Sequence, residues 1–274
     1  GIKLVYVFDG KPPELKGKTH EKRKGLRDLA QGKYESAKQE ENLELMRRYS
    51  SQLARLNEEM IEESKELLEA MGIAVVQAPG EGEAEASYLA KKKEIYAVAS
   101  QDYDSLLFGA PILIQNLTLA RKRKTISGWV EIKPEMIELE KVFNYHEMNL
   151  DQLICLGILV GTDYNPRGVP GIGQKKALEI VKKYKQPVLI FKEVEEKIMS
   201  LPEEDRFDWK EIFELFHKPE VKDFDFKFPK INEEKIKKIL VKEHDFSEER
   251  VDKQLERLKE AKESQKQKGL EKWF

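Results

Sequence analysis

The sequence has little of what extracellular and membrane proteins depend on. Its 274 residues include one cysteine, Cys155, so no disulfide can form within the chain, which indicates a reducing compartment. Cys155 lies in the apolar run DQLICLGILVG, where we expect it to pack in a core. No apolar run approaches the about 18 residues of a membrane-spanning helix, and no signal-peptide pattern opens the chain. We therefore expect an intracellular protein, or one whose targeting segment is absent.

A strong net charge is also lacking, because 49 Lys and Arg residues nearly balance 51 Asp and Glu residues. The distribution of charge is more informative than the total. The segment from Lys11 to Lys33 contains eight basic residues and three acidic residues, and the cluster RKRK occupies positions 121–124. Each group is explained either as a solvated face or hairpin tip, or as a phosphate-binding patch.

Short apolar runs alternate with helical patterns. We expect strands within 1–10, 73–77, 94–100, 111–117 and 128–132, the first of them a buried strand, and helices within 34–72 and 81–93. After Asn149, a predicted N-cap with Gln152 three residues on, the chain is mostly helical. This order predicts an α/β fold with a largely parallel sheet. Because the chain opens on a buried strand, we expect the natural protein to begin upstream of Gly1.

Acidic residues follow an apolar strand or helix at four separate places. The segments are VYVFDG, APGEGEAEAS, AVASQDYDS and LGILVGTDY, and their acidic residues are Asp9, Glu81, Glu83, Asp102, Asp104 and Asp163. Each one alone has an ordinary explanation as a turn, cap or first-turn residue. However, the carboxyl ends of parallel strands meet at one edge of a sheet. The repetition therefore predicts one acidic cluster.

Such a cluster would be unstable unless protonation or bound cations relieved the repulsion between its charges. Two like charges about 4 Å apart repel by roughly 4 kcal/mol at an effective dielectric constant of 20. The four histidines, His20, His146, His217 and His244, lie outside the acidic motifs, so a zinc site is not expected. Carboxylate oxygens favour Mg²⁺ or Mn²⁺, and a pair of such ions suits phosphodiester hydrolysis.

Two further motifs indicate binding. In GVPGIGQKKALEIVKKY, the glycines Gly168, Gly171 and Gly173 form a turn before a helix with Lys175 and Lys176. This pattern is typical of a helix-hairpin-helix turn that holds a nucleic-acid backbone, although a plain glycine-rich loop is the alternative.

The chain ends in QKGLEKWF, an exposed aromatic pair on a polar tail. Such a tail is typical of a docking peptide, the alternative being a terminus that folds back on the core.

Five segments together resemble a flap endonuclease of the structure-specific 5′-nuclease family, most like its archaeal members. They are FDGKPPELK, APGEGEAEAS, ASQDYDSLLFG, GILVGTDYNPRGVPGIGQKKALEIV and QKGLEKWF. The resemblance implies a PIN-like α/β nuclease fold with a helical arch and a helix-hairpin-helix (H2TH-type) element. It also implies a Mg²⁺-dependent endonuclease that cleaves 5′ flaps of branched DNA in replication and repair, with a 5′–3′ exonuclease side activity. If the source is archaeal, the location is cytoplasmic.

The resemblance also assigns roles to residues. It places two Mg²⁺ ions, replaceable by Mn²⁺, on the six acidic residues named above, and leaves Glu85 as a helix-surface residue. Lys16 and Arg23 fall where the family contacts the scissile phosphate. The turn with Gly168, Gly171, Gly173, Lys175 and Lys176 would hold duplex DNA, with K⁺ among its carbonyl groups. Gln267, Leu270, Trp273 and Phe274 match the peptide that docks on the PCNA sliding clamp.

We expect a nuclease domain at 1–241, with the arch at about 14–72 and the helix-hairpin-helix at about 151–184. A helical extension at 242–266 and the clamp peptide at 267–274 follow, in a protein that is monomeric alone. The family's opening strand, with a further metal-binding aspartate, has no counterpart before Gly1, so the activity of this chain alone is an open question. Alternatives are a related nuclease that prefers bubbles or nicked junctions, an inactive truncated form, and a non-catalytic clamp-bound DNA-binding protein.

Overall fold

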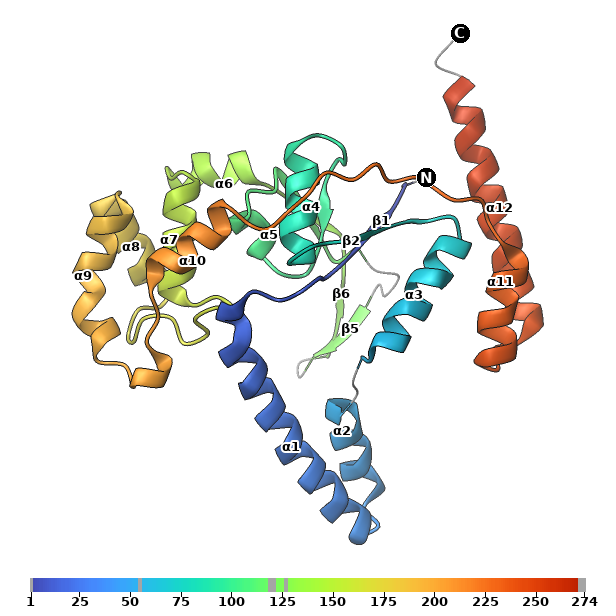
Figure 1. Ribbon diagram of the computed structural model, residues 1–274, viewed down its shortest axis with the longest axis horizontal. Coiled ribbons are helices and arrows are strands. Elements are labelled where there is room, and N and C mark those ends of the chain that lie inside the picture. The colour runs from blue at the N-terminus through green and yellow to red at the C-terminus, as the bar shows by residue number, and fades with distance from the viewer. Residues whose placement is uncertain (1, 54–55, 118–121, 126–127, 271–274) are drawn as a thin grey trace. The chain divides into compact units, whose positions relative to one another are not determined.

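The computed structural model describes residues 2–53, 56–117, 122–125 and 128–270. Figure 1 shows the chain as a ribbon. Its internal contacts divide it into two compact units. One comprises Gly1–Phe8, Lys33–Gln77 and Phe224–Phe274, and the other comprises Asp9–Gly32 and Ala78–Asp223. No helix in the described part of the chain is long and apolar enough to cross a membrane.

The first unit contains a two-stranded parallel sheet and several helices. Strand β1 (Val5–Phe8) pairs with β2 (Ala74–Gln77), with Val5 opposite Ala74. The prediction that the first strand is buried is wrong, because Tyr6 is 44% exposed and none of the four residues of β1 is fully buried.

The helices between these strands in the sequence are α1 (Gly17–Gln39), α2 (Leu43–Leu53) and α3 (Glu58–Ala70). A short 3₁₀ turn at Glu14–Lys16 precedes them. Among the described residues of 14–70 there is no strand, as the helical pattern predicted. After α3, Gly72 has φ +75°, a left-handed conformation that favours glycine and ends the helix.

The C-terminal part of the first unit is helical. It comprises α11 (Glu233–Lys237), a π-helical turn at Lys238–Glu243 and α12 (Glu248–Leu270). A small core joins α3, α11 and α12 through Ala70, Ile236, Val251 and Leu255.

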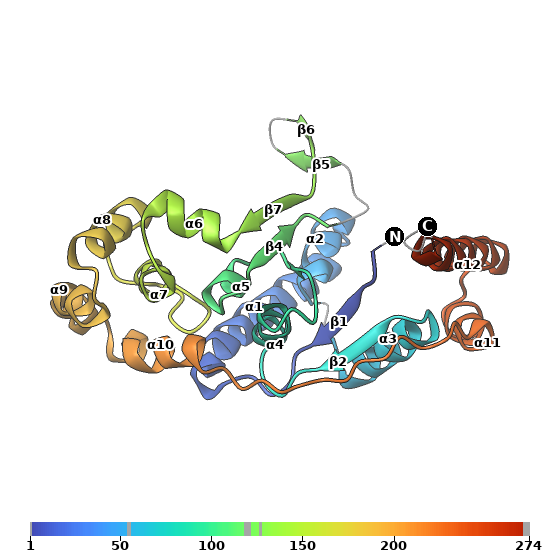
Figure 2. The ribbon, with the colours of Figure 1, turned by 90° about the horizontal axis from the view of Figure 1, so that it is seen from above.

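The second unit contains the remaining strands. Strands β3 (Val98–Ala99) and β4 (Ile112–Gln115) are parallel. Strand β7 (Glu135–Glu138) pairs antiparallel with β4 (Figure 2). Strands β5 (Lys122–Thr125) and β6 (Gly128–Glu131) form an antiparallel hairpin that contains three of the four basic residues of RKRK. Parallel pairing is confirmed in β1–β2 and β3–β4, but the described strands lie in three small sheets rather than one.

The rest of the second unit is mainly helical, and most of its helices contribute to the larger core. The helices are α4 (Gly82–Lys91), α5 (Asp104–Leu107), α6 (Leu139–His146), α7 (Leu150–Val160), α8 (Gln174–Tyr184), α9 (Pro187–Met199) and α10 (Trp209–His217). The predicted capping box is present, since Asn149 and Gln152 exchange hydrogen bonds at the start of α7. Cys155 is fully buried in this core, and burial raises the pKa of its thiol to about 12, so it is an unreactive packing residue.

Candidate active site

The turn that precedes α4 is held against the turn that follows β1. Gly10 N–H donates to Gly80 O at 2.6 Å, and Gly82 N–H donates to the Asp9 carboxylate at 2.7 Å. A Cβ atom on Gly10 would lie 2.2 Å from Ala78 O, so only glycine permits this approach. The first two predicted acidic segments are therefore adjacent, as the sequence analysis expected.

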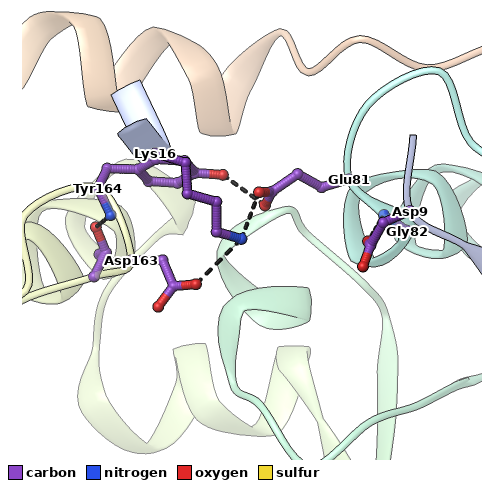
Figure 3. A network of polar contacts seen from close by, with 7 residues as sticks. Asp9, Lys16, Glu81, Gly82, Asp163 and Tyr164 are labelled. Atoms are coloured by element: carbon purple, nitrogen blue, oxygen red, sulfur yellow. Dashed lines mark hydrogen bonds and ion pairs between the residues drawn. The ribbon is translucent and has the colours of Figure 1, made fainter. Parts of the chain in front are cut away.

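Glu81 is held at both carboxylate oxygens (Figure 3). Lys16 Nζ lies 2.6 Å from Glu81 Oε1, and the Tyr164 hydroxyl donates to Oε2 at 2.6 Å. The same ammonium group lies 3.1 Å from Asp163 Oδ2. Lys16 thus bridges the β2–α4 turn and the end of α7.

Glu83 is held by the turn that follows β3. The Ser100 hydroxyl donates a short hydrogen bond to Glu83 Oε1, and Ser100 Oγ itself accepts from Asp102 N–H at 3.1 Å. Asp104 is the first residue of α5, two residues further on. The second and third acidic segments are therefore also adjacent.

All six predicted acidic residues line one cleft of about 1080 Å³, as do Lys16 and Lys175. Apolar residues of α5 and α7 form part of its wall, among them Leu107, Leu156 and Val160. Acidic groups from four stretches of sequence thus share one solvent-accessible space, which supports the proposal of a single site.

The charges in the cleft affect one another. Burial, opposed by the Ser100 hydrogen bond and reinforced by repulsion from Asp104 and Asp102, raises the pKa of Glu83 to about 7. Burial and repulsion from Asp163 and Asp102 raise the pKa of Asp104 to about 6. Burial disfavours the Lys16 ammonium, but Glu81 and Asp163 outweigh this effect and raise its pKa. The cleft therefore favours an added positive charge.

The donor chemistry of the cleft fits a hard divalent cation, because the described residues that line it offer six carboxylates and no thiolate, with His146 as their single imidazole. A ready coordination shell is not present, since no group of three or more Asp, Glu, His or Cys residues in the described ranges is arranged to hold an ion. Lys16 instead supplies the positive charge between Glu81 and Asp163.

The glycine-rich turn between α7 and α8 has the geometry that its sequence predicted. Gly168 and Gly171 have φ values of +57° and +69°, and a Cβ atom on Gly168 would lie 2.4 Å from Val160 O. Gly173 is the N-cap of α8. Lys175 and Lys176 are exposed in the first turn of that helix, which has no acidic residue there. Cations are unfavourable at a helix N-terminus, so this end of α8 is suited to an anion.

The comparisons with known proteins agree on one family. The family model "XPG I-region" matches residues 72–163, which contain five of the six acidic residues. Flap endonuclease 1 of Pyrococcus furiosus is 50% identical over 277 residues, an alignment that covers all of this chain and 78% of the relative. The relative of that name from Sulfolobus acidocaldarius is also 50% identical, with 80% of its length covered.

The chain belongs to the flap endonuclease family.

Solved structures agree with this assignment. A flap endonuclease-1 from Methanococcus jannaschii aligns with a TM-score of 0.66 and 38% identity, over 93% of this chain and 74% of that one. The catalytic core of Rad2 in complex with a DNA substrate aligns with a TM-score of 0.65 over 94% of this chain and 79% of that one. At 22% identity, this second match supports the shared 5′-nuclease fold. Nucleases of the flap endonuclease type depend on metal ions.

Several residues with predicted functional roles lie outside the part of the chain that the structure describes. They are Trp273 and Phe274 and the side chains of Arg23, Gln267 and Leu270. Helix α12 extends to Leu270, so the backbone of the first residues of the predicted clamp peptide is helical. The roles of all five residues stay predictions.

The prediction that Glu85 lies on the helix surface is wrong. Its side chain is fully buried, Oε2 accepts from Lys222 N–H at 3.1 Å, and Oε1 has no hydrogen-bond partner among the described residues. On the same face of α4, Tyr88 and Lys92 both donate to Asp223. This face therefore binds the segment that follows α10, and burial raises the pKa of Glu85.

Sequence reasoning also missed Tyr164 and Ser100, which hold Glu81 and Glu83. Both lie in acidic segments that the sequence analysis singled out, one residue after Asp163 and two before Asp102. The signal that could have found them is this adjacency, because hydroxyl groups beside clustered carboxylates are natural hydrogen-bond donors to them.

Proposed function

We propose that this chain is a structure-specific endonuclease that cleaves 5′ flaps of branched DNA by metal-dependent phosphodiester hydrolysis. The observation that carries the proposal is the single cleft lined by Asp9, Glu81, Glu83, Asp102, Asp104 and Asp163. The family assignment supplies the substrate class, since relatives that are 49–50% identical over all of this chain carry the name flap endonuclease.

The six carboxylates would hold Mg²⁺, with Mn²⁺ able to replace it. Two such ions bound there would activate a water molecule and stabilise the leaving oxygen. The residues of the chain itself have separate tasks. Lys16, which pairs with Glu81 and Asp163, would donate to a phosphate oxygen and so stabilise developing negative charge. Arg23, on α1, would add a guanidinium contact to the scissile phosphate.

The turn at Gly168–Lys176 would hold the uncut duplex strand. Backbone N–H groups at the start of α8 and the exposed Lys175 and Lys176 suit a phosphate backbone and read no bases. Lys175 also lines the cleft, so the duplex-binding turn and the acidic residues are contiguous. A K⁺ ion among the carbonyl groups of this turn is part of the proposal.

The tail would tether the enzyme to a sliding clamp of the PCNA type through Gln267, Leu270, Trp273 and Phe274. The support is the spacing of these residues in QKGLEKWF. We propose that the protein is monomeric alone and acts where chromosomal DNA is replicated and repaired, which is the cytoplasm in an archaeal cell.

The test uses a labelled 5′-flap duplex with and without Mg²⁺. It is applied to this chain and to a form extended at its N-terminus by the opening segment that the resemblance implies. We expect metal-dependent product that the Asp102→Ala variant does not form. If neither form gives such product, the nuclease proposal fails. If the flap is bound but never cut, the non-catalytic DNA-binding alternative is correct.

A further inference from the structure

The turn that contains Ser100 is fixed by strand β4. Ser100 N–H donates to Ile114 O at 3.2 Å, and the carbonyl group of Gln101 accepts from Gln115 Nε2 at 2.8 Å. Gln115 is only 6% exposed, so this second bond is sheltered from water. The position of the Ser100 hydroxyl is therefore set by the sheet.

The direction of each hydrogen bond at the Ser100 hydroxyl follows from the protons of the groups that it contacts. The main-chain N–H of Asp102 can only donate, so Ser100 Oγ accepts there, at 3.1 Å. The single hydroxyl proton is then donated to Glu83 Oε1. This bond engages one oxygen of Glu83, and the carboxylate retains Oε2 for another ligand. A hydrogen bond to an ionised acceptor is stronger than a neutral one.

We propose that Ser100 is a positioning residue that fixes the Glu83 carboxylate relative to Asp102, and so sets the spacing of two metal ligands. This inference rests on the proposed function, because it assigns Ser100 to the same site. Ser100 acts through the two acidic residues and needs no contact with DNA. This role explains why a hydroxyl group follows the last residue of β3, two residues before Asp102.

A second serine provides a matched control. The Ser87 hydroxyl is fully buried, and its single proton is shared between two main-chain carbonyl oxygens, Glu83 O at 2.6 Å and Ser105 O at 3.1 Å. It therefore joins α4 to the segment that contains α5, as Ser100 does, but it reaches no carboxylate. Loss of the Ser87 hydroxyl loosens the packing without freeing a carboxylate.

The experiment compares wild type with Ser100→Ala, Ser100→Thr and Ser87→Ala. Mg²⁺ or Mn²⁺ binding is measured by calorimetry without DNA, flap cleavage is measured at single turnover across metal concentrations, and unfolding is followed in a chelator. Changes to groups that orient metal ligands cost about 10-fold to 100-fold in metal affinity or activity, and we expect Ser100→Ala to fall in this range. Its affinity for flap DNA without metal should equal that of wild type.

Ser100→Thr retains the hydroxyl and should restore metal affinity to near the wild-type value. Ser87→Ala should lower the unfolding midpoint but leave metal affinity unchanged. Wild-type metal affinity in Ser100→Ala would overturn the inference, and so would an equal loss of affinity in Ser87→Ala. In either case the wild type would still cleave, whereas a failed function would show as a wild type that neither binds metal nor cleaves.

Discussion

The Lys16 ammonium group lies 2.6 Å from Glu81 Oε1 and 3.1 Å from Asp163 Oδ2, between two carboxylates that come from different elements. In the protein without metal it neutralises part of the acidic cluster. A divalent ion that binds Glu81 and Asp163 must therefore compete with Lys16 for the same oxygen atoms. Release of Lys16 toward a DNA phosphate would couple metal binding to substrate binding.

We predict opposite effects of Lys16→Met on metal binding and on cleavage. Affinity for Mn²⁺ without DNA should rise, because the competing ammonium group is gone. Single-turnover cleavage should fall by about 100-fold or more, the scale seen when one donor to transition-state charge is removed. Lys11→Met, a change at an exposed lysine of the neighbouring turn, is the control. Unchanged metal affinity in Lys16→Met would contradict the competition.

The metal-free protein should lose stability as the pH rises. The pKa of Glu83 is raised from 4.5 to about 7, and that of Asp104 from 3.8 to about 6. The folded state therefore holds these protons more tightly than the unfolded state does. The stabilisation is complete below about pH 4 and is lost as the pH rises to about 7.

The Glu83→Gln variant isolates this effect. We compare the free energy of unfolding of this variant with that of wild type, both in a chelator. The difference, variant minus wild type, should increase by up to about 3 kcal/mol between pH 4.5 and pH 7. Chemical denaturation at several pH values measures the difference. Saturating Mg²⁺ should stabilise wild type most at the high end of this range. A difference that does not change with pH would show that Glu83 titrates normally in the folded protein.

Glu85 should respond differently to two substitutions. Glu85→Gln retains an acceptor for Lys222 N–H and removes a buried charge, so cleavage and stability should stay close to wild type. Glu85→Ala removes the acceptor of the Lys222 N–H hydrogen bond and the packing of a fully buried side chain, so the free energy of unfolding should fall by about 1 kcal/mol or more. Thermal unfolding and flap cleavage measure both. By comparison, Glu83→Gln should abolish cleavage, and an equal effect of Glu85→Gln would mean that Glu85 belongs to the metal site.

The error at Glu85 shows what the sequence could and could not predict. The spacing of Glu81, Glu83 and Glu85 at the start of a helix predicts that their side chains point in different directions. It does not predict which part of the chain packs against each face of the helix. Glu85 accepts a hydrogen bond from Lys222 N–H, which is 137 residues away in the sequence. No local pattern encodes this contact. The strand and helix order was predictable because it depends on short periodic patterns. The hydrogen bonds of Ser100 and Tyr164 were not predictable, because they depend on tertiary packing.

The glycine-rich turn was predictable from the sequence because its conformation depends on local backbone geometry and not on distant contacts. Gly168 at φ +57°, with Val160 O 2.4 Å from a would-be Cβ atom, admits only glycine, and α8 begins immediately after Gly173. A sequence pattern of this kind specifies a conformation directly.

The lysines at the two ends of α8 should contribute differently to DNA binding. Lys175→Ala with Lys176→Ala should weaken binding of flap DNA and reduce the salt dependence of binding, by a slope of up to about 0.9 for each phosphate that the variant no longer neutralises. The control is Lys182→Ala with Lys183→Ala, which removes the same charge from the last turn of the same helix. Fluorescence anisotropy at several salt concentrations, in a metal chelator, measures both slopes. If α8 binds phosphate through its N-terminus, only the first pair changes the slope. Equal changes in the two pairs would mean that the whole charge of the helix attracts DNA, and that the glycine turn does not hold the backbone.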